Sequence, residues 1–185
     1  MMNLVFLVEE RSMKELLNGI LPKILPKAIS FQIIPHDGKS DLQRSISKKM
    51  AGWNVPDTKF VILHDQDSAD CKELKQKLRR IVEQTGKEAV IRIVCRELES
   101  WYFGDLRAVS LAYNENLEPL AKRKKYRIPD EIGNPKEELK KIIPVHQQIS
   151  GARRIGPLMN IDANTSESFR QFVQGVRHLT KKDLT

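Results

Sequence analysis

Carboxylate residues follow three of the short apolar runs in this chain. Glu9 comes after the first run, Asp65 and Asp67 come after the third, and Glu97 and Glu99 come after the fourth. Carboxylates that crowd together repel one another, so such a set normally balances a cation, and oxygen ligands with few histidines favour Mg²⁺ or Mn²⁺ over zinc. Such a metal positions a phosphodiester, lowers the pKa of an attacking water and stabilises the leaving oxygen. The residue types therefore predict metal-dependent phosphoryl chemistry.

Each carboxylate also has an ordinary structural explanation. An aspartate at the end of a strand often forms an Asx turn or caps the next helix, and an acid in the first turn of a helix complements the helix dipole. We expect Glu10 and Asp70 to be such first-turn acids, which complement a helix dipole. Three clusters after three separate runs favour the metal site for the other acids, but spacing alone does not choose between Glu97 and Glu99.

Four short apolar runs alternate with helical patterns through the first two thirds of the chain. They are rich in β-branched residues and almost continuously apolar, which is typical of strands buried on both faces. The runs are Leu4–Val8, Ser30–Ile34, Lys59–Leu63 and Ala89–Cys95. This order predicts an α/β fold with a four-stranded parallel sheet flanked by helices. Because the carboxyl ends of parallel strands share the edge where ligands bind, the three acidic clusters should converge there.

Helical periodicity fills the intervals and continues after the fourth run. The expected helices are Met13–Leu25, Asp41–Gly52, Ser68–Gly86, Leu98–Tyr113, Pro135–Ile143 and Ser166–Leu179. Pro22 should kink or end the first of them, and the last should begin with a Ser or Thr cap. Glu118–Pro135 is rich in proline and turn residues and predicts a long loop or mobile connection. We therefore expect an α/β core over residues 1–113, with a basic loop and a C-terminal helical extension of the same domain over residues 114–185.

The basic residues indicate a polyanionic partner such as nucleic acid. Lys and Arg number 32 against 24 Asp and Glu, a net charge of +8, and such an excess displaces the counterions condensed on a phosphate backbone. Lys39 follows the second run within a Gly-Lys-Ser tripeptide and could neutralise a phosphate. The tripeptide is not an ATPase loop, since Ile33 stands where the Walker pattern needs its first glycine. A solvated lysine in a flexible turn fits the spacing equally well.

A second basic group lies in the C-terminal third of the chain. It consists of Lys122, Arg123, Lys124, Lys125 and Arg127, with Tyr126 among them. These cations could follow a nucleic-acid backbone while the tyrosine stacks on one base. An isolated run of charge is also often just a solvated loop.

Several protein classes are excluded by composition and spacing. With 40% hydrophobic and 30% charged residues, the chain has an ordinary globular composition. Its two cysteines, Cys71 and Cys95, fit neither a disulfide framework nor a zinc site, so we expect small buried hydrophobes. No apolar run approaches the roughly 20 residues of a membrane span, and the first residues lack a secretory signal pattern. We expect a cytoplasmic protein with no membrane partner.

Segments along nearly the whole chain resemble known families. The strand Leu4–Glu9 with Ser12, read with the strand that leads into Asp65-Gln66-Asp67, resembles the Toprim fold shared by topoisomerases, primases and overcoming-lysogenization-defect nucleases. More closely, the chain is similar to the domain-of-unknown-function 4276 family. The segments that carry this likeness are His36–Leu42, Asp65–Asp67 with Asp70-Cys71 and Leu74-Lys75, Arg96–Asp105, Arg127–Asp130 with Asn134-Pro135, and Ser166–Phe172. Arg96–Asp105 is the most specific of them.

The resemblance implies a Toprim-like sheet and roles for particular residues. Glu9 would be the Toprim glutamate, a general acid/base or metal ligand, and Asp65 and Asp67 would be its metal-binding pair. Toprim domains usually have glycine directly after that glutamate, whereas Glu10 stands here. The family context also implies prokaryotic phage defence beside an ATPase partner of the SMC-like kind.

Together these features lead to a nuclease hypothesis. The expected enzyme uses Mg²⁺ or Mn²⁺ to cleave nucleic acid, with Glu9 and Lys39 as catalytic residues. Asp65, Asp67 and either Glu97 or Glu99 would hold the metal. The alternative is a non-catalytic Toprim-like subunit that binds nucleic acid or regulates an ATPase partner. A small-molecule phosphotransferase is less favoured, because no nucleotide-binding loop is visible in the sequence.

Overall fold

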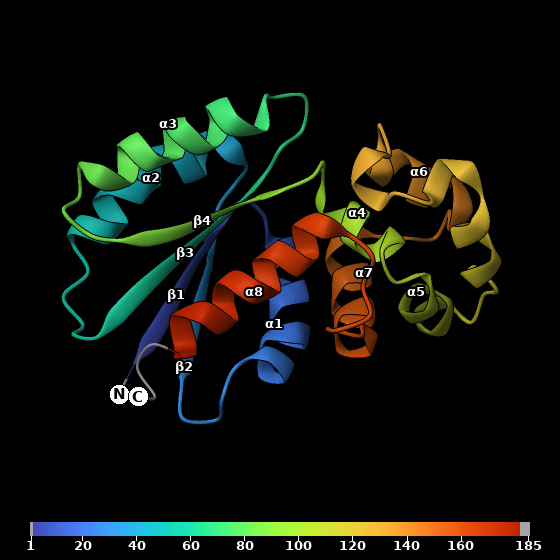
Figure 1. Ribbon diagram of the computed structural model, residues 1–185, viewed down its shortest axis with the longest axis horizontal. Coiled ribbons are helices and arrows are strands. Elements are labelled where there is room, and N and C mark those ends of the chain that lie inside the picture. The colour runs from blue at the N-terminus through green and yellow to red at the C-terminus, as the bar shows by residue number, and fades with distance from the viewer. Residues whose placement is uncertain (1, 182–185) are drawn as a thin grey trace.

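A four-stranded, all-parallel sheet forms the centre of the molecule, as a computed structural model of residues 2–181 shows (Figure 1). Met1, in the expected core 1–113, and residues 182–185, in the expected extension 114–185, lie outside the described residues. The strands are β1 (Asn3–Val8), β2 (Ser30–Pro35), β3 (Thr58–Asp65) and β4 (Ala89–Val94). Their order is β2-β1-β3-β4. The α/β class and the four expected strands are confirmed, although β4 ends before Cys95.

Helices cover both faces of this sheet (Figure 1). On one face lie α2 (Lys39–Ala51) and α3 (Cys71–Glu83), and on the other lie α1 (Arg11–Ile24) and α8 (Glu167–Lys181). Successive side chains of a strand point to opposite faces, so Val5 and Leu7 pack under α2 and α3 while Leu4 and Phe6 pack on the opposite side. Burial on both faces explains why the strands read as continuous apolar runs.

The strand order creates a crevice between β1 and β3. The chain leaves β1 toward β2 on one side, and it leaves β3 toward β4 on the other side. Ligands bind at such a reversal point, outside the carboxyl ends of the strands. Val8 pairs with Leu63 at the last rung that the two strands share. Glu9 and Asp65 therefore leave the sheet at nearly the same level, beside this crevice.

Four further helices gather at the end of the molecule toward which the strands run (Figure 1). They are α4 (Leu98–Phe103), α5 (Leu106–Tyr113), α6 (Pro135–Ile142) and α7 (Gln148–Ile155). α7 packs against α1. The chain then passes through a 3₁₀ turn, η4 (Gly156–Leu158), into α8. Ser166 caps α8 by accepting a bond from Phe169 N at 3.2 Å, so the expected serine cap is confirmed. Within residues 2–181, no helix is long and apolar enough to cross a membrane.

The expected single helix Leu98–Tyr113 is wrong, because the chain bends at Gly104 and Asp105. Asp105 caps α5 by accepting a hydrogen bond from Ala108 N at 3.1 Å. A Cβ on Gly104 would lie 2.0 Å from Asn164 Oδ1. The bend therefore depends on a close approach by a segment that is distant in sequence. Pro22, by contrast, lies within α1, and the helix continues to Ile24.

The connection Glu118–Pro135, predicted as a long loop or mobile connection, has neither α-helix nor strand before α6 begins at Pro135. Its residues form three short 3₁₀ helices, η1 (Glu118–Lys122), η2 (Lys124–Tyr126) and η3 (Pro129–Glu131). Tyr126 is buried and stacks on Phe103, with ring centroids 5.2 Å apart. Tyr126 is therefore not free to stack on a base. The helix α7 had no counterpart in the sequence-based expectation.

Candidate functional site

The three acidic clusters meet at one cavity beside the carboxyl edge of the sheet. This cavity, here called the acidic cavity, has a volume of about 120 Å³. Its lining includes all five acids singled out from the sequence, namely Glu9, Asp65, Asp67, Glu97 and Glu99. Glu10 lines it too, and its carboxylate accepts a hydrogen bond from Ser12 Oγ at 3.2 Å. Asp70 stands apart and caps α3.

Backbone bonds set the positions of the carboxylates from β1 and β3. Glu9 Oε2 accepts a hydrogen bond from Asp65 N at 3.1 Å, which ties the ends of the two strands together. Asp67 has a left-handed φ of 51°, a conformation that aspartate tolerates better than most residues. Its backbone N donates to Arg96 O at 3.0 Å. The loop after β3 is therefore held against the segment that follows β4.

The buried acids of this cavity have too few cationic neighbours to balance their charge. Glu9 and Glu99 are only 5% and 3% exposed, and burial raises the pKa of each to about 7. Burial, and then the neighbouring Glu9, raise the pKa of Asp65 well above its usual range. Asp65 Oδ1 is buried and has no hydrogen-bond partner. A buried acceptor without a partner is costly, so this cluster calls for a proton or a cation.

The carboxylate oxygens of the acidic cavity are the type of ligand that a hard divalent cation binds. Carboxylate oxygens are the preferred ligands of Mg²⁺ and Mn²⁺, and Asp65 Oδ1 offers a free acceptor. In the part of the chain that the structure describes, however, no three His, Cys, Asp or Glu side chains are close enough together to hold an ion. Asp67 accepts instead from Lys39 Nζ at 2.9 Å. Asp67 would have to leave Lys39 to complete a ligand set.

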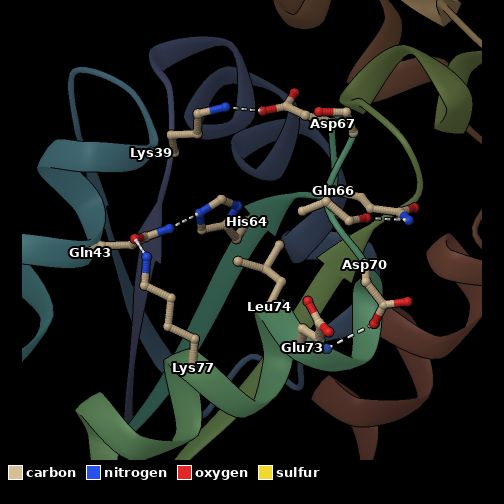
Figure 2. A pocket seen from close by; sticks show the side chains of 11 residues that line it. Lys39, Gln43, His64, Gln66, Asp67, Asp70, Glu73, Leu74 and Lys77 are labelled. Carbon is tan, nitrogen blue, oxygen red and sulfur yellow. Dashed lines mark hydrogen bonds and ion pairs between the residues drawn. The ribbon is translucent and has the colours of Figure 1, made fainter.

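Lys39 lines a second, larger cavity (Figure 2). It is the first residue of α2, and its side chain is 58% exposed. Gly38 N donates to Glu9 O at 3.1 Å, which fixes the start of α2 beside the end of β1. The second cavity has a volume of about 360 Å³, and Asp67 lines both cavities. A ligand bound in one cavity would therefore reach the edge of the other.

A chain of hydrogen bonds runs from Lys77 through Gln43 to His64 in the second cavity (Figure 2). Lys77 Nζ donates to Gln43 Oε1 at 2.7 Å, so the Gln43 amide nitrogen must be the donor to His64 Nε2, at 2.9 Å. His64 Nδ1 then carries the proton, and it lies 2.6 Å from Asp65 O and 3.0 Å from Glu9 Oε2. Burial lowers the pKa of His64. The neutral imidazole thus donates from Nδ1 to Asp65 O and lies beside the Glu9 carboxylate.

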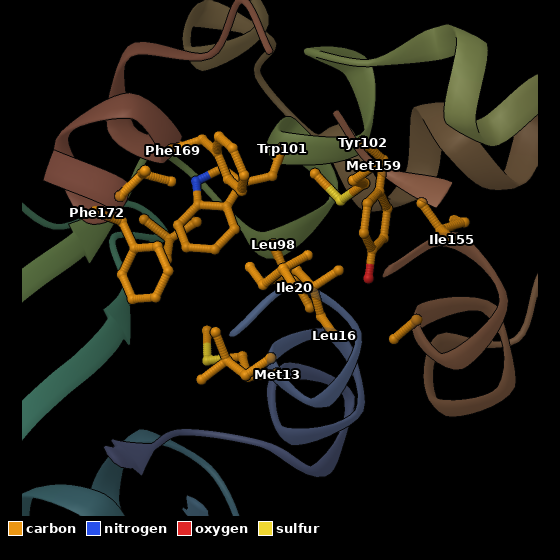
Figure 3. Packing of buried hydrophobic residues seen from close by; sticks show 14 of the residues in the cluster. Met13, Leu16, Ile20, Leu98, Trp101, Tyr102, Ile155, Met159, Phe169 and Phe172 are labelled. Carbon is orange, nitrogen blue, oxygen red and sulfur yellow. The ribbon is translucent and has the colours of Figure 1, made fainter. Parts of the chain in front are cut away.

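α4 carries Glu99, directly follows Glu97, and is anchored by aromatic packing. Trp101 lies between Phe169 and Phe172 of α8, with centroid distances of 5.1 and 5.2 Å (Figure 3). The indole Nε1 also donates to Ser168 Oγ at 2.9 Å. This anchor fixes the direction of the helix, and Trp101 is buried in the core.

The two candidate glutamates differ in surroundings. Glu97 Oε2 accepts from Lys136 N at 3.1 Å at the start of α6, whereas Glu99 is almost fully buried. Both line the acidic cavity, so the choice between them stays open.

Sequence reasoning did not single out several polar residues of the two cavities, among them Gln43, His64, Lys136 and Gln148. His64 alone had a signal, since it directly precedes Asp65. Gln43 lies within α2, Lys136 on α6 and Gln148 on α7, and no motif marks any of them.

The basic tract is not part of either cavity. Lys122, Arg123, Lys124, Lys125 and Arg127 are exposed, and none of them lines the acidic cavity or its neighbour. Lys125 and Lys141 form ion pairs with Glu138, and hydrogen bonds from these two lysines lower the pKa of that carboxyl to about 2. Any contact that the tract makes with nucleic acid would therefore be away from the acidic cavity.

The chain belongs to a family described as a domain of unknown function (DUF4276), whose sequence model matches residues 8–177. The match includes the acidic residues, Lys39 and the basic tract. Comparisons with curated proteins and with solved structures give no match. The parallel sheet is the arrangement expected from the Toprim resemblance, and the relation to Toprim stays a prediction.

Glu99→Gln should stabilise the protein at high pH when divalent cations are absent. Below its ordinary pKa of 4.5 Glu99 is protonated in both states, and up to about 7 only the folded protein keeps the proton. The free energy of unfolding contributed by Glu99 therefore falls as pH rises through this window. The variant lacks this loss and should gain about 3 kcal/mol above pH 7 relative to wild type.

Urea unfolding in chelator at about pH 5 and about pH 8 measures this difference. Glu131→Gln, at an exposed carboxylate, is the matched control and should show no such gain. An equal difference between wild type and Glu99→Gln at both pH values would contradict the expectation.

Proposed function

We propose that this protein is a Mg²⁺- or Mn²⁺-dependent nuclease that hydrolyses phosphodiester bonds in nucleic acid. One observation carries the proposal: Glu9, Asp65, Asp67, Glu97 and Glu99 line a single small cavity at the reversal point of a parallel sheet. Their buried charge needs a cation, and the chain's net charge of +8 suits a polyanionic substrate.

The acidic residues divide into metal ligands and a proton acceptor. Asp65 and Asp67, with Glu97 or Glu99, would hold the metal, which when bound polarises a phosphate and acidifies a water. Glu9 has a pKa raised to about 7 by burial, which suits a general base near neutral pH. Asp65 N donates to Glu9 Oε2 and fixes the orientation of the carboxylate that would accept the proton, and His64 Nδ1 lies 3.0 Å from the same oxygen.

Lys39 has a role on the substrate side. Its ammonium group now neutralises Asp67 at 2.9 Å from an exposed position. Once Asp67 turns toward a cation, this ammonium is free at the mouth of the cavity. It would then neutralise a phosphate oxygen of the substrate.

Removal of both metal-binding aspartates should abolish metal binding and cleavage. For Asp65→Asn with Asp67→Asn, we expect no Mn²⁺ binding by calorimetry. Cleavage of plasmid DNA or RNA in the same buffer should fall at least about 100-fold, because charge stabilisation at the phosphate is lost. The double variant Glu131→Gln with Asp162→Asn removes two exposed carboxylates and should retain both properties.

Other results would redirect the assignment. Nucleic-acid binding that survives in the aspartate variant, without metal binding or cleavage in wild type, would favour a non-catalytic subunit. The cleavage assay includes an arm with an SMC-like ATPase, because the family resemblance implies such a partner and a role in phage defence.

Lys39→Ala should separate metal binding from cleavage. Without its ion pair Asp67 is a freer ligand, so Mn²⁺ should bind about two- to fivefold more tightly, the worth of an exposed pair. Cleavage should nevertheless fall about tenfold or more, because a phosphate contact is lost. Lys48→Ala, at an exposed position of the same helix, should change neither. Metal binding and cleavage that fall together would contradict this role.

The exposed cations of the basic tract should contribute salt-dependent affinity. Lys122→Ala, Arg123→Ala and Lys124→Ala together should weaken binding to a DNA duplex regardless of its sequence. The slope of log K against log salt should become shallower by about 2 to 3, since each phosphate contact contributes about 0.9. Fluorescence anisotropy over a salt series measures this slope.

The matched control removes the same charge elsewhere, with Arg44→Ala, Lys48→Ala and Arg80→Ala at exposed positions. Equal slopes for the two triple variants would show that the tract has no special role and only contributes to net charge.

A further inference from the structure

The only two cysteines of the chain lie side by side. The sequence predicts buried hydrophobes, but Cys71 and Cys95 are half-buried free thiols. Both line a cavity of about 230 Å³, together with Lys75 and Arg92. Burial, and then the neighbouring Cys71, raise the pKa of the Cys95 thiol to about 12.

The fold explains why these two residues meet. Asp65 on β3 pairs with Val94 on β4, and Gln66 N extends the pairing with a 2.9 Å bond to Val94 O. A tight turn then brings Ala69 N within 3.0 Å of Gln66 O. α3 consequently begins beside the end of β4, with Cys71 as its first residue. Cys95 is held there by a bond from its backbone N to Ser168 Oγ at 3.3 Å.

We propose that Cys71 and Cys95 form a reversible oxidation site, at which hydrogen peroxide closes an intramolecular disulfide. The first thiol sulfur attacks peroxide, so an S–O bond forms, the O–O bond breaks and one water leaves. The second sulfur then displaces the new hydroxyl as water while the S–S bond forms. The two thiols lose two electrons and two protons in total, and peroxide is reduced to two waters.

Closure of the disulfide would act on the acidic cavity; this part of the inference rests on the proposed function. Cys71 ends the loop that carries Asp67, and Cys95 opens the segment that carries Glu97. Both carboxylates line the acidic cavity. A disulfide requires sulfur atoms about 2.05 Å apart, so the two loops must draw together. We expect the oxidised protein to bind Mn²⁺ about tenfold more weakly.

Mass spectrometry of the wild-type protein tests the disulfide directly. The reduced protein is treated with a small excess of hydrogen peroxide and then alkylated. We expect a mass loss of about 2 Da, no alkylated cysteine, a cross-linked peptide pair that contains Cys71 and Cys95, and full reversal by dithiothreitol. Cys71→Ser and Cys95→Ser should each keep an unpaired cysteine and show no such loss.

Sulfinic acid on either cysteine, a disulfide between two copies of the chain, or two alkylated thiols would overturn the proposal. Mn²⁺ calorimetry on the reduced and oxidised protein tests the link to the acidic cavity. Weaker binding after oxidation supports this link, and equal binding overturns it. If even the reduced protein binds no Mn²⁺, the proposed function and the link both fail, while the mass measurement still decides whether the disulfide forms.

Discussion

Mutual repulsion among buried carboxylates is the constraint on which this structure depends. Glu9, Asp65 and Glu99 are each less than a tenth exposed and share one cavity. If stability alone decided the fold, these residues would not lie together, because each carboxylate loses hydration and faces a second negative charge. The strand order explains how the crowding arises, since β1 and β3 end side by side where the chain connections diverge. Acids at two adjacent strand ends must then share one crevice.

The surrounding groups relieve this repulsion without removing it. Asp65 N donates to Glu9, and Lys39 pairs with Asp67. Asp65 Oδ1 remains without a partner, and the pKa values of Glu9 and Glu99 stay near 7. The most buried carboxylates therefore lack a neutralising cation. Asp67, by contrast, is neutralised by the exposed Lys39. Carboxyl groups with pKa values shifted in this way cluster at functional sites in proteins, which is why the cavity is the candidate site.

The sheet and its acids could be predicted from sequence because they follow local rules. Continuous apolar runs mark strands that are buried on both faces, and parallel topology alone predicts that Glu9, Asp65 and the segment with Glu97 and Glu99 meet at one edge. The errors occur where distant segments decide the structure. Asn164 packs where a side chain at Gly104 would be and helps to break a helix, and Phe103 stacks on Tyr126 and draws it into the core. No sequence pattern encodes either partner, and the same is true of the contact between the two cysteines.

Residues that follow β4 complete the site rather than merely extend the sheet. Lys136 and Gln148 supply one wall of the acidic cavity, and Ser168 of α8 bonds both Trp101 Nε1 and Cys95 N. Through Ser168, a single helix fixes both α4 and the end of β4. The loop after β3 is in turn bonded to that end through Gln66 N and Asp67 N. Asp67, Glu97 and the two thiols thus stand on segments that cannot move independently, so a change in charge at the carboxylates and a change in oxidation at the cysteines act on the same pair of loops.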